Sequence, residues 1–283
     1  MPENTTVESF KTVIDTVQKS SGDDSSWILH HIMDGRELDF EPLFTIHIPQ
    51  FPLIFGIDLT PTKHIVFMWV TALSVLILFT FIARKYRKSL IPDRIANLFE
   101  VLILFVRNDI AKSTIGKGFE RYVPYLLTLF FFILLGNFLG LLPWSATFTS
   151  NIGMTATLAI CTFFMTQFSG IRSNGFFGYI KGLMPPGIPI PLLPLMAIVE
   201  LLGLFTKPFA LAIRLFANMV AGHTVILGMI GLIFFMGTIL VAPVSIIFVV
   251  FIYLLEILVA LIQAYIFTIL TSLFIGMAVH QEH

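Results

Sequence analysis

The feature that most constrains the fold is a pair of almost uninterrupted apolar stretches in the last third of the chain, residues 195–235 and 243–279. A helix needs only about 20 apolar residues to cross a hydrocarbon core of about 30 Å. As one helix, the second stretch would be roughly 55 Å long. It would then lean by roughly 55° from the membrane normal, against a usual tilt of about 20°. The pattern predicts a steeply tilted helical hairpin, and a span with an interfacial extension is the alternative.

Three earlier apolar segments, residues 64–83, 125–142 and 152–168, are also candidates to cross a membrane. Hydrophobic residues make up 57% of the chain and charged residues only 12%. Residues 93–114 differ, because their alternating apolar and charged positions are typical of an amphipathic helix on a membrane surface. We therefore expect an all-α integral membrane protein with about five membrane-crossing helices plus one amphipathic surface helix. Zero net charge gives no support to a nucleic-acid partner.

The basic cluster at residues 84–88 predicts the orientation, since lysine and arginine gather on the inner side of a membrane. By that rule the acidic N-terminal segment 1–62 lies outside, and residues 63–283 form the helical membrane domain. The histidines in or beside the acidic segment lack carboxylate or cysteine partners at the spacing of a metal site. We expect no metal site and read them as loop histidines: His30, His31, His47 and His64.

Arg214 lies well inside the apolar stretch 195–235. A charged side chain near the centre of a bilayer costs at least ~3 kcal/mol on insertion scales, so it is normally paired, solvated from a cavity or used on an ion path. At about 100° per residue, a helix places this arginine on one stripe with other polar side chains. The stripe consists of Glu200, Lys207, Arg214 and Asn218. The alternative is a row of long side chains that reach the interface near helix ends.

Glu256 and Gln263 are seven residues apart in the second stretch, so they share one face of a helix. His223 is the nearest candidate partner for Glu256 if the hairpin closes between residues 236 and 243, because the two side chains then lie at comparable depths. A hydrogen-bonded core histidine is the alternative for His223. Asn137, in the segment 125–142, is equally compatible with an interhelical hydrogen bond and with a proton path.

These residues and their spacing resemble subunit a of the F-type ATP synthase. The resemblance rests on Arg214-Leu-Phe-Ala-Asn218 followed by His223, then on Glu256, then on Leu261-Ile-Gln263-Ala-Tyr-Ile-Phe, and it covers most of the chain after residue 60. Some members have an acid at the place of His223 and a histidine at the place of Glu256. This chain has the two exchanged, as the mitochondrial type does. It has Gly140 where some members have an acid, so no proton-path role is assigned there.

The resemblance implies a stator subunit that faces a rotating ring of c subunits and forms two proton half-channels, with the proton-channel core at residues 190–280. Arg214 would face the ring carboxylate. Glu256 and His223 would line the outer half-channel, while Gln263 and Asn218 would flank the arginine. Glu200 would border the inner exit, where Lys207 has either an electrostatic or a packing role. Implied partners are the c ring, the peripheral-stalk b subunits and the other synthase subunits, in a bacterial cell membrane or, alternatively, the mitochondrial inner membrane.

Two other classes of membrane protein fit less well. An ion-pumping respiratory or secondary-transporter subunit also places charges inside the membrane, but such folds usually show internal repeats, and none is visible here. An enzyme would need a nucleophile or a metal motif, and nucleotide binding by the common route would need a phosphate loop. The sequence has neither motif, so we expect no catalytic site, no direct nucleotide binding and no cofactor in this chain.

Overall fold

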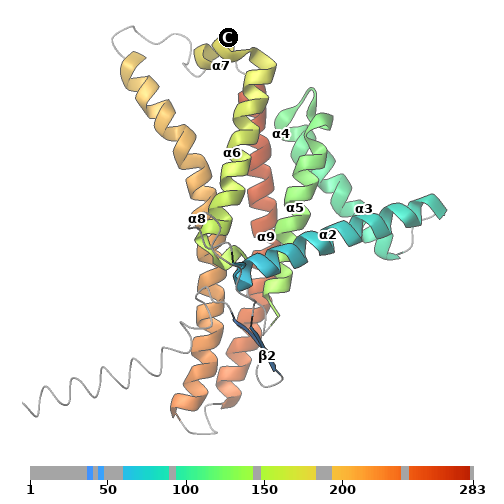
Figure 1. Ribbon diagram of the computed structural model, residues 1–283, viewed down its shortest axis with the longest axis vertical. Coiled ribbons are helices and arrows are strands. Elements are labelled where there is room, and N and C mark those ends of the chain that lie inside the picture. The colour runs from blue at the N-terminus through green and yellow to red at the C-terminus, as the bar shows by residue number, and fades with distance from the viewer. Residues whose placement is uncertain are drawn as a thin grey trace, which may run out of the picture. The chain divides into compact units, whose positions relative to one another are not determined.

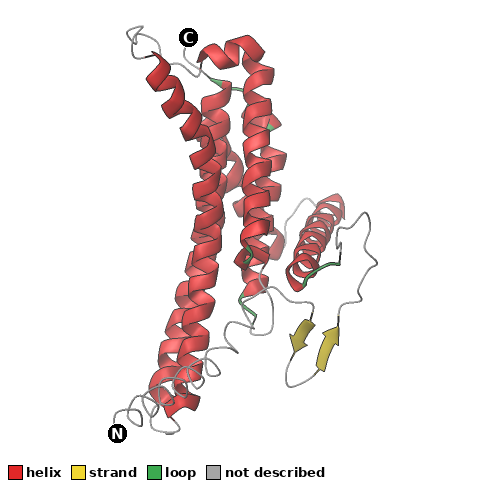
Figure 2. Cartoon of the chain, turned by 60° about the vertical axis from the view of Figure 1, so that its left-hand side comes forward, coloured by secondary structure: helices red, strands yellow, loops and turns green. Residues whose placement is uncertain are grey.

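The structure is a computed structural model that describes residues 37–40, 44–47, 60–88, 94–142, 148–182, 193–236 and 242–280 (Figure 1). A short hairpin of two antiparallel strands comes first, and helices follow (Figure 2). The elements are β1 Glu37–Phe40, β2 Phe44–His47, α2 Lys63–Lys88, α3 Arg94–Leu104, the π-helix η1 Phe105–Lys112, α4 Ser113–Ile115, the 3-10 turn η2 Phe119–Arg121, α5 Val123–Gly140, the 3-10 turn η3 Phe148–Ser150, α6 Ile152–Asn174, α7 Phe176–Gly182, α8 Leu193–Met236 and α9 Ala242–Val279.

The chain divides into two compact units, each described by itself. One contains residues 1–63 and 220–252, and the other contains residues 64–219 and 253–283. The second unit holds α2 to α7, the first part of α8 and the last part of α9.

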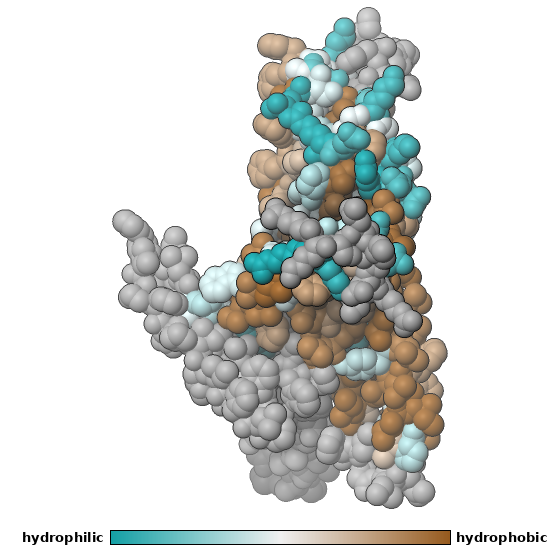
Figure 3. Space-filling model, turned by 90° about the vertical axis from the view of Figure 1, so that its right-hand side faces the viewer, coloured by the Kyte–Doolittle hydropathy of each residue, from teal (hydrophilic) through white to brown (hydrophobic). Residues whose placement is uncertain are grey.

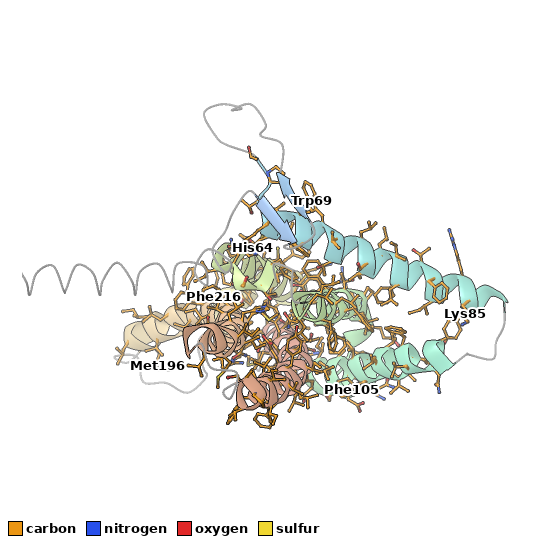
Figure 4. All side chains as sticks on the ribbon, turned by 90° about the horizontal axis from the view of Figure 1, so that it is seen from below. His64, Trp69, Lys85, Phe105, Met196 and Phe216 are labelled. Atoms are coloured by element: carbon orange, nitrogen blue, oxygen red, sulfur yellow. The ribbon has the colours of Figure 1, made fainter. Side chains whose placement is uncertain are left out.

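Helices α2 and α3 of the larger unit lie side by side, with Lys85 near the end where they meet (Figure 4). The Tyr86 hydroxyl donates a 2.6 Å hydrogen bond to the Glu100 carboxylate across this pair. Deeper in the unit, the rings of Phe79 from α2 and Phe99 from α3 both contact Phe131 of α5. Aromatic packing, edge-to-face for Phe79 and tilted for Phe99, therefore joins both helices to the core.

The π-helix η1 continues α3 and packs its buried residues Val106, Ile110 and Ala111 into the core. The centres of the Phe105 ring and the Tyr265 ring of α9 lie 5.7 Å apart, with the ring planes tilted by 35°. About two turns further along, the hydroxyl groups of Thr114 and Ser272 lie 2.5 Å apart. These contacts fix the last part of α9 against residues 105–115.

Helices α5 and α6 are adjacent, and the Tyr125 and Thr162 hydroxyl groups lie 3.3 Å apart between them. Proline in the first turn of α5 suits a position where no helical N–H bond is needed. Asn151 caps α6, because its side chain accepts a hydrogen bond from the Gly153 N–H at 2.8 Å. The surface of the described residues is largely apolar, and hydrophilic side chains gather toward one end (Figure 3).

The predicted fold class is confirmed: five described helices are long and apolar enough to cross a membrane, and the protein is a multi-pass membrane protein. Their candidate spans are Lys63–Tyr86, Val123–Gly140, Ile152–Asn174, Leu202–Leu232 and Ala242–Val279. Both long apolar stretches form single helices, α8 with 44 residues and α9 with 38. Pro208 lies inside α8, where the missing N–H leaves the Leu204 carbonyl without its helical donor. The tilt of the hairpin stays a prediction.

The structure differs from the sequence analysis in three places. The β1–β2 hairpin was not expected in the acidic segment. His64 is not a loop histidine, because it is the second residue of α2 and only 2% exposed. The expected amphipathic helix 93–114 contains an eight-residue π-helical part. His30 and His31 lie outside the described residues. His47 is the last residue of β2.

Candidate functional site

The candidate site lies where α8 and α9 meet within the larger unit. Asn218 of α8 donates a 2.8 Å hydrogen bond from Nδ2 to Oε1 of Gln263 on α9. Gln263 is 2% exposed, and its Nε2 has no hydrogen-bond partner among the described residues. A buried amide nitrogen whose N–H donors are unused costs about 1–3 kcal/mol relative to a satisfied one. The unused N–H donors of Gln263 therefore lie beside Asn218.

Arg214 lies on the exposed side of α8, one turn before Asn218. The adjoining side of this helix packs inward through Leu211 and Leu215, which are 2% and 1% exposed. Exposed apolar side chains precede Arg214 on α8, among them Phe209, 64% exposed, and Ile213, 39% exposed. In the described part of the chain, no carboxylate lies within ion-pair distance of Arg214. The guanidinium is thus presented outward from an apolar surface.

Glu256 is buried on α9, at 5% exposure, two turns before Gln263. Neither of its carboxyl oxygens has a hydrogen-bond partner among the residues that the structure describes. Unsatisfied buried carboxyl groups are rare in folded proteins and call for a specific explanation, such as a proton-transfer role or a water molecule. One turn earlier, the Tyr253 hydroxyl donates to the carbonyl oxygen of Leu141, which follows α5.

Lys207 is half-buried, and its Nζ lies 5.6 Å from the centre of the Phe274 ring on α9. This cation–π contact is of a kind that stabilises a charge in apolar surroundings. It places Lys207 on the side of α8 that faces the last part of α9. The packing role left open for this residue therefore has a specific partner in the structure.

The structure brings together some of the predicted residues and leaves others apart. Asn218 and Gln263 are in contact, and Arg214 and Glu256 belong to the same unit. His223 is half-buried in the portion of α8 that belongs to the other unit, so its pairing with Glu256 stays a prediction. For Glu200 the structure describes only the helical backbone.

Two polar groups near the site show how sequence reasoning falls short. Asn137 is 2% exposed, and its Oδ1 accepts a 3.1 Å hydrogen bond from the Thr149 hydroxyl in η3. This hydrogen bond joins α5 to the 3-10 turn η3 rather than to another membrane-length helix, and the proton-path role stays a prediction. Tyr253 was not singled out, and only its position one turn from Glu256 could have drawn attention to it.

The described residues contain no group of three or more histidine, cysteine, aspartate or glutamate side chains that could hold a metal ion. The chemistry available to the site is that of a fixed arginine charge, one buried carboxyl group and an amide pair. These groups can hold or pass a proton and can stabilise an anion that approaches the exposed side of α8.

Comparison with known proteins gives one consistent family. Residues 65–276 match the family described as "ATP synthase A chain". The chain is 52% identical over 259 residues to "ATP synthase subunit a" of Chloroherpeton thalassium, with 90% of this chain and 77% of the relative covered. It is 50% identical over 259 residues to "ATP synthase subunit a 2" of Chlorobium luteolum, with 90% of this chain and 76% of the relative covered. It is 51% identical over 238 residues to "ATP synthase subunit a" of an Anaeromyxobacter species, with 82% and 58% covered.

Proposed function

The chain belongs to the ATP synthase A chain family, and from this premise we propose that it is the membrane stator wall along which protons reach and leave a rotating ring of c subunits. It makes no ATP itself. It passes protons to and from carboxylates on the ring, and the resulting rotation couples the proton gradient to ATP synthesis elsewhere in the complex.

The position of Arg214 carries this proposal. Its guanidinium is exposed on an apolar side of α8, and no described carboxylate lies within ion-pair distance. A counter-ion supplied by a second protein matches that arrangement. When a ring carboxylate passes, the nearby cation favours its ionised form and expels its proton at one place on the circuit. The same fixed charge blocks direct proton flow between the two half-channels.

Other site residues divide between the two half-channels. Glu256 and His223 take up protons from outside, because an isolated buried acid needs a proton donor or acceptor nearby. Gln263 and Asn218 flank the arginine and keep its surroundings polar. Glu200 borders the inner exit, and Lys207 contributes its charge there.

The bacterial origin of the relatives supports a place in a bacterial cell membrane. The proposed partners are the c ring, the peripheral-stalk b subunits and the remaining synthase subunits. Residues 1–62 would form an acidic segment outside the membrane, and residues 63–283 the membrane domain. The proton-channel core would comprise residues 190–280.

The decisive experiment replaces Arg214 in the assembled complex, reconstituted in liposomes. Arg214→Lys keeps a charge but loses the planar, always-ionised fork, so coupled ATP synthesis should be lost. Arg214→Ala should also abolish synthesis and should let protons leak through the sector. Arg121→Ala serves as a control, because Arg121 is also an exposed arginine but lies in η2. Near wild-type synthesis by Arg214→Ala under a proton gradient would overturn the proposal.

A further inference from the structure

The short helix α7 is held in one orientation at the end of α6. Gly175, with φ 72°, turns the chain between the two helices. Tyr179 then packs its ring against Gly170, where an added methyl group would overlap the ring. The Tyr179 hydroxyl donates a 2.7 Å hydrogen bond to Oε1 of Gln167. The buried Tyr179 is thus held both at its ring, by Gly170, and at its hydroxyl, by Gln167. These two contacts set the orientation of α7 about its own axis.

That orientation leaves an apolar surface uncovered. Phe177 is 86% exposed and Phe176 is 59% exposed, and their rings meet edge to face at 5.7 Å. Ile180 is 46% exposed beside them. Among the described large hydrophobic residues, Phe177 has the highest exposed fraction. We call Phe176, Phe177 and Ile180 the α7 apolar surface.

Helix α7 lies at the level where two membrane-length helices end (Figures 1 and 2). The Asn174 Nδ2 donates to the Ala278 carbonyl at 2.9 Å, and the Ser173 hydroxyl donates to the Val279 carbonyl at 3.2 Å. These bonds satisfy carbonyls that the end of α9 would otherwise leave unpaired. The ends of α6 and α9 and the start of α7 are therefore at one depth. Exposed cations flank the surface, namely Arg172 and Lys181.

We propose that α7 is an interfacial anchor whose apolar surface inserts into the boundary between lipid headgroups and acyl chains. Arg172 and Lys181 then lie among the phosphate groups of the lipids. Short helices with aromatic residues on one side and cations on the other bind in this way, with the apolar side about 5–10 Å below the headgroups. Anionic headgroups add an attraction for each nearby lysine or arginine.

A lipid fits this surface better than a protein partner does. The three exposed side chains offer roughly 400 Å² between them, taking 150–250 Å² for a fully exposed aromatic ring. Stable protein interfaces bury about 800 Å² on each partner. The flanking cations match phosphates spread in a plane, and the position at the helix ends matches the depth of the interface. Its insertion would fix the depth of the inner ends of α6 and α9.

Spin labelling of the assembled complex in liposomes tests this anchor without measuring proton transport. Cys161 is first replaced by serine, and a nitroxide is attached to Phe177→Cys or, as the matched control on the same helix, to Lys181→Cys. Collision with oxygen reports acyl chains, and collision with a water-soluble nickel chelate reports solvent. We expect the label at 177 to favour oxygen and the label at 181 to favour the chelate.

Two outcomes would overturn the proposal. A label at 177 that collides mainly with the chelate would place α7 in water. A label shielded from both reagents would place a protein partner over the surface. Adding Gly170→Ala should displace the Tyr179 ring and reduce the preference for oxygen at 177, while Tyr179→Phe, which keeps the ring, should change it less. If the label at 177 shows the same preference for oxygen in all these variants, the Gly170–Tyr179 contact does not set the depth of α7 in the membrane.

Discussion

Gly276 of α9 lies directly against the backbone of Thr114, so that a side chain on Gly276 would overlap the Thr114 carbonyl oxygen. The neighbouring hydroxyl pair, Thr114 and Ser272, lies 2.5 Å apart. Helices approach this closely where a small residue faces a partner backbone. The last part of α9 is therefore positioned by direct backbone contact with α4.

We predict that Gly276→Ala destabilises the protein by about 1–3 kcal/mol, the usual cost of overpacking a tight contact. Backbone, unlike a flexible side chain, cannot move aside easily. The measurement is unfolding of the purified subunit in mixed detergent micelles. Gly203→Ala is the matched control, because Gly203 is also inside a long helix and no atom lies within 4 Å of the added methyl group. Equal stability of the two variants would show that the contact is not a tight one.

A second prediction concerns Asn218 and Gln263. Asn218→Ala removes the one described hydrogen bond of the buried Gln263 amide, so it should destabilise the subunit by about 1–3 kcal/mol. The double variant with Asn218→Ala and Gln263→Leu should lose less stability than the two single variants together, because it leaves no buried amide unpaired. The double-mutant cycle, measured by unfolding, should give a coupling energy of about 0.5–3 kcal/mol. Additive losses would mean that the two amides act independently.

The third prediction is that His223 and Glu256 act as one unit in proton uptake. Either His223→Glu or Glu256→His alone should reduce proton-driven ATP synthesis, while both together should restore part of it. The measurement is the synthesis rate in liposomes under an imposed proton gradient. Thr224→Val is a suitable control, because the Thr224 hydroxyl donates only to the Val220 carbonyl of its own helix. No recovery in the exchanged variant would argue against a functional pair.

The membrane topology gives a fourth prediction. With the native cysteine replaced, Ser20→Cys should react with an impermeant thiol reagent only from outside, and Lys117→Cys only from inside. The basic residues at 84–88, 94, 107–121, 172 and 181 motivate this orientation. Labelling of position 20 from the cytoplasmic side would reverse the orientation of the whole chain.

The sequence predicted the long helices well, because an apolar stretch in a membrane has few alternatives to a helix. The predicted segments 195–235 and 243–279 agree with α8 and α9 to within two residues at each end. The segment 152–168 was predicted six residues too short, because all the residues from Ser169 to Asn174 except Ile171 are polar or small, and the helix continues through them. Apolar content alone does not mark where such a helix ends.

Contacts between distant residues could not be predicted in the same way. The hydrogen bond from Tyr253 to the Leu141 carbonyl joins segments more than a hundred residues apart, and no local pattern signals it. The burial of His64 depends on what packs around the start of α2, which hydropathy does not reveal. By contrast, the Asn218–Gln263 contact was anticipated in part, because both residues were expected beside the arginine.

The π-helix η1 also bears on how the chain tolerates changes in length. A π-helical turn holds one residue more than an α-helical turn, since its hydrogen bonds run from i to i+5. Removing one residue within Phe105–Lys112 would let the segment become α-helical while α3 and α4 keep their phase. A deletion within α3 itself would instead rotate η1 and α4 by about 100° relative to the start of α3. We therefore expect η1, between α3 and α4, to tolerate the loss of one residue without turning Thr114 away from Ser272.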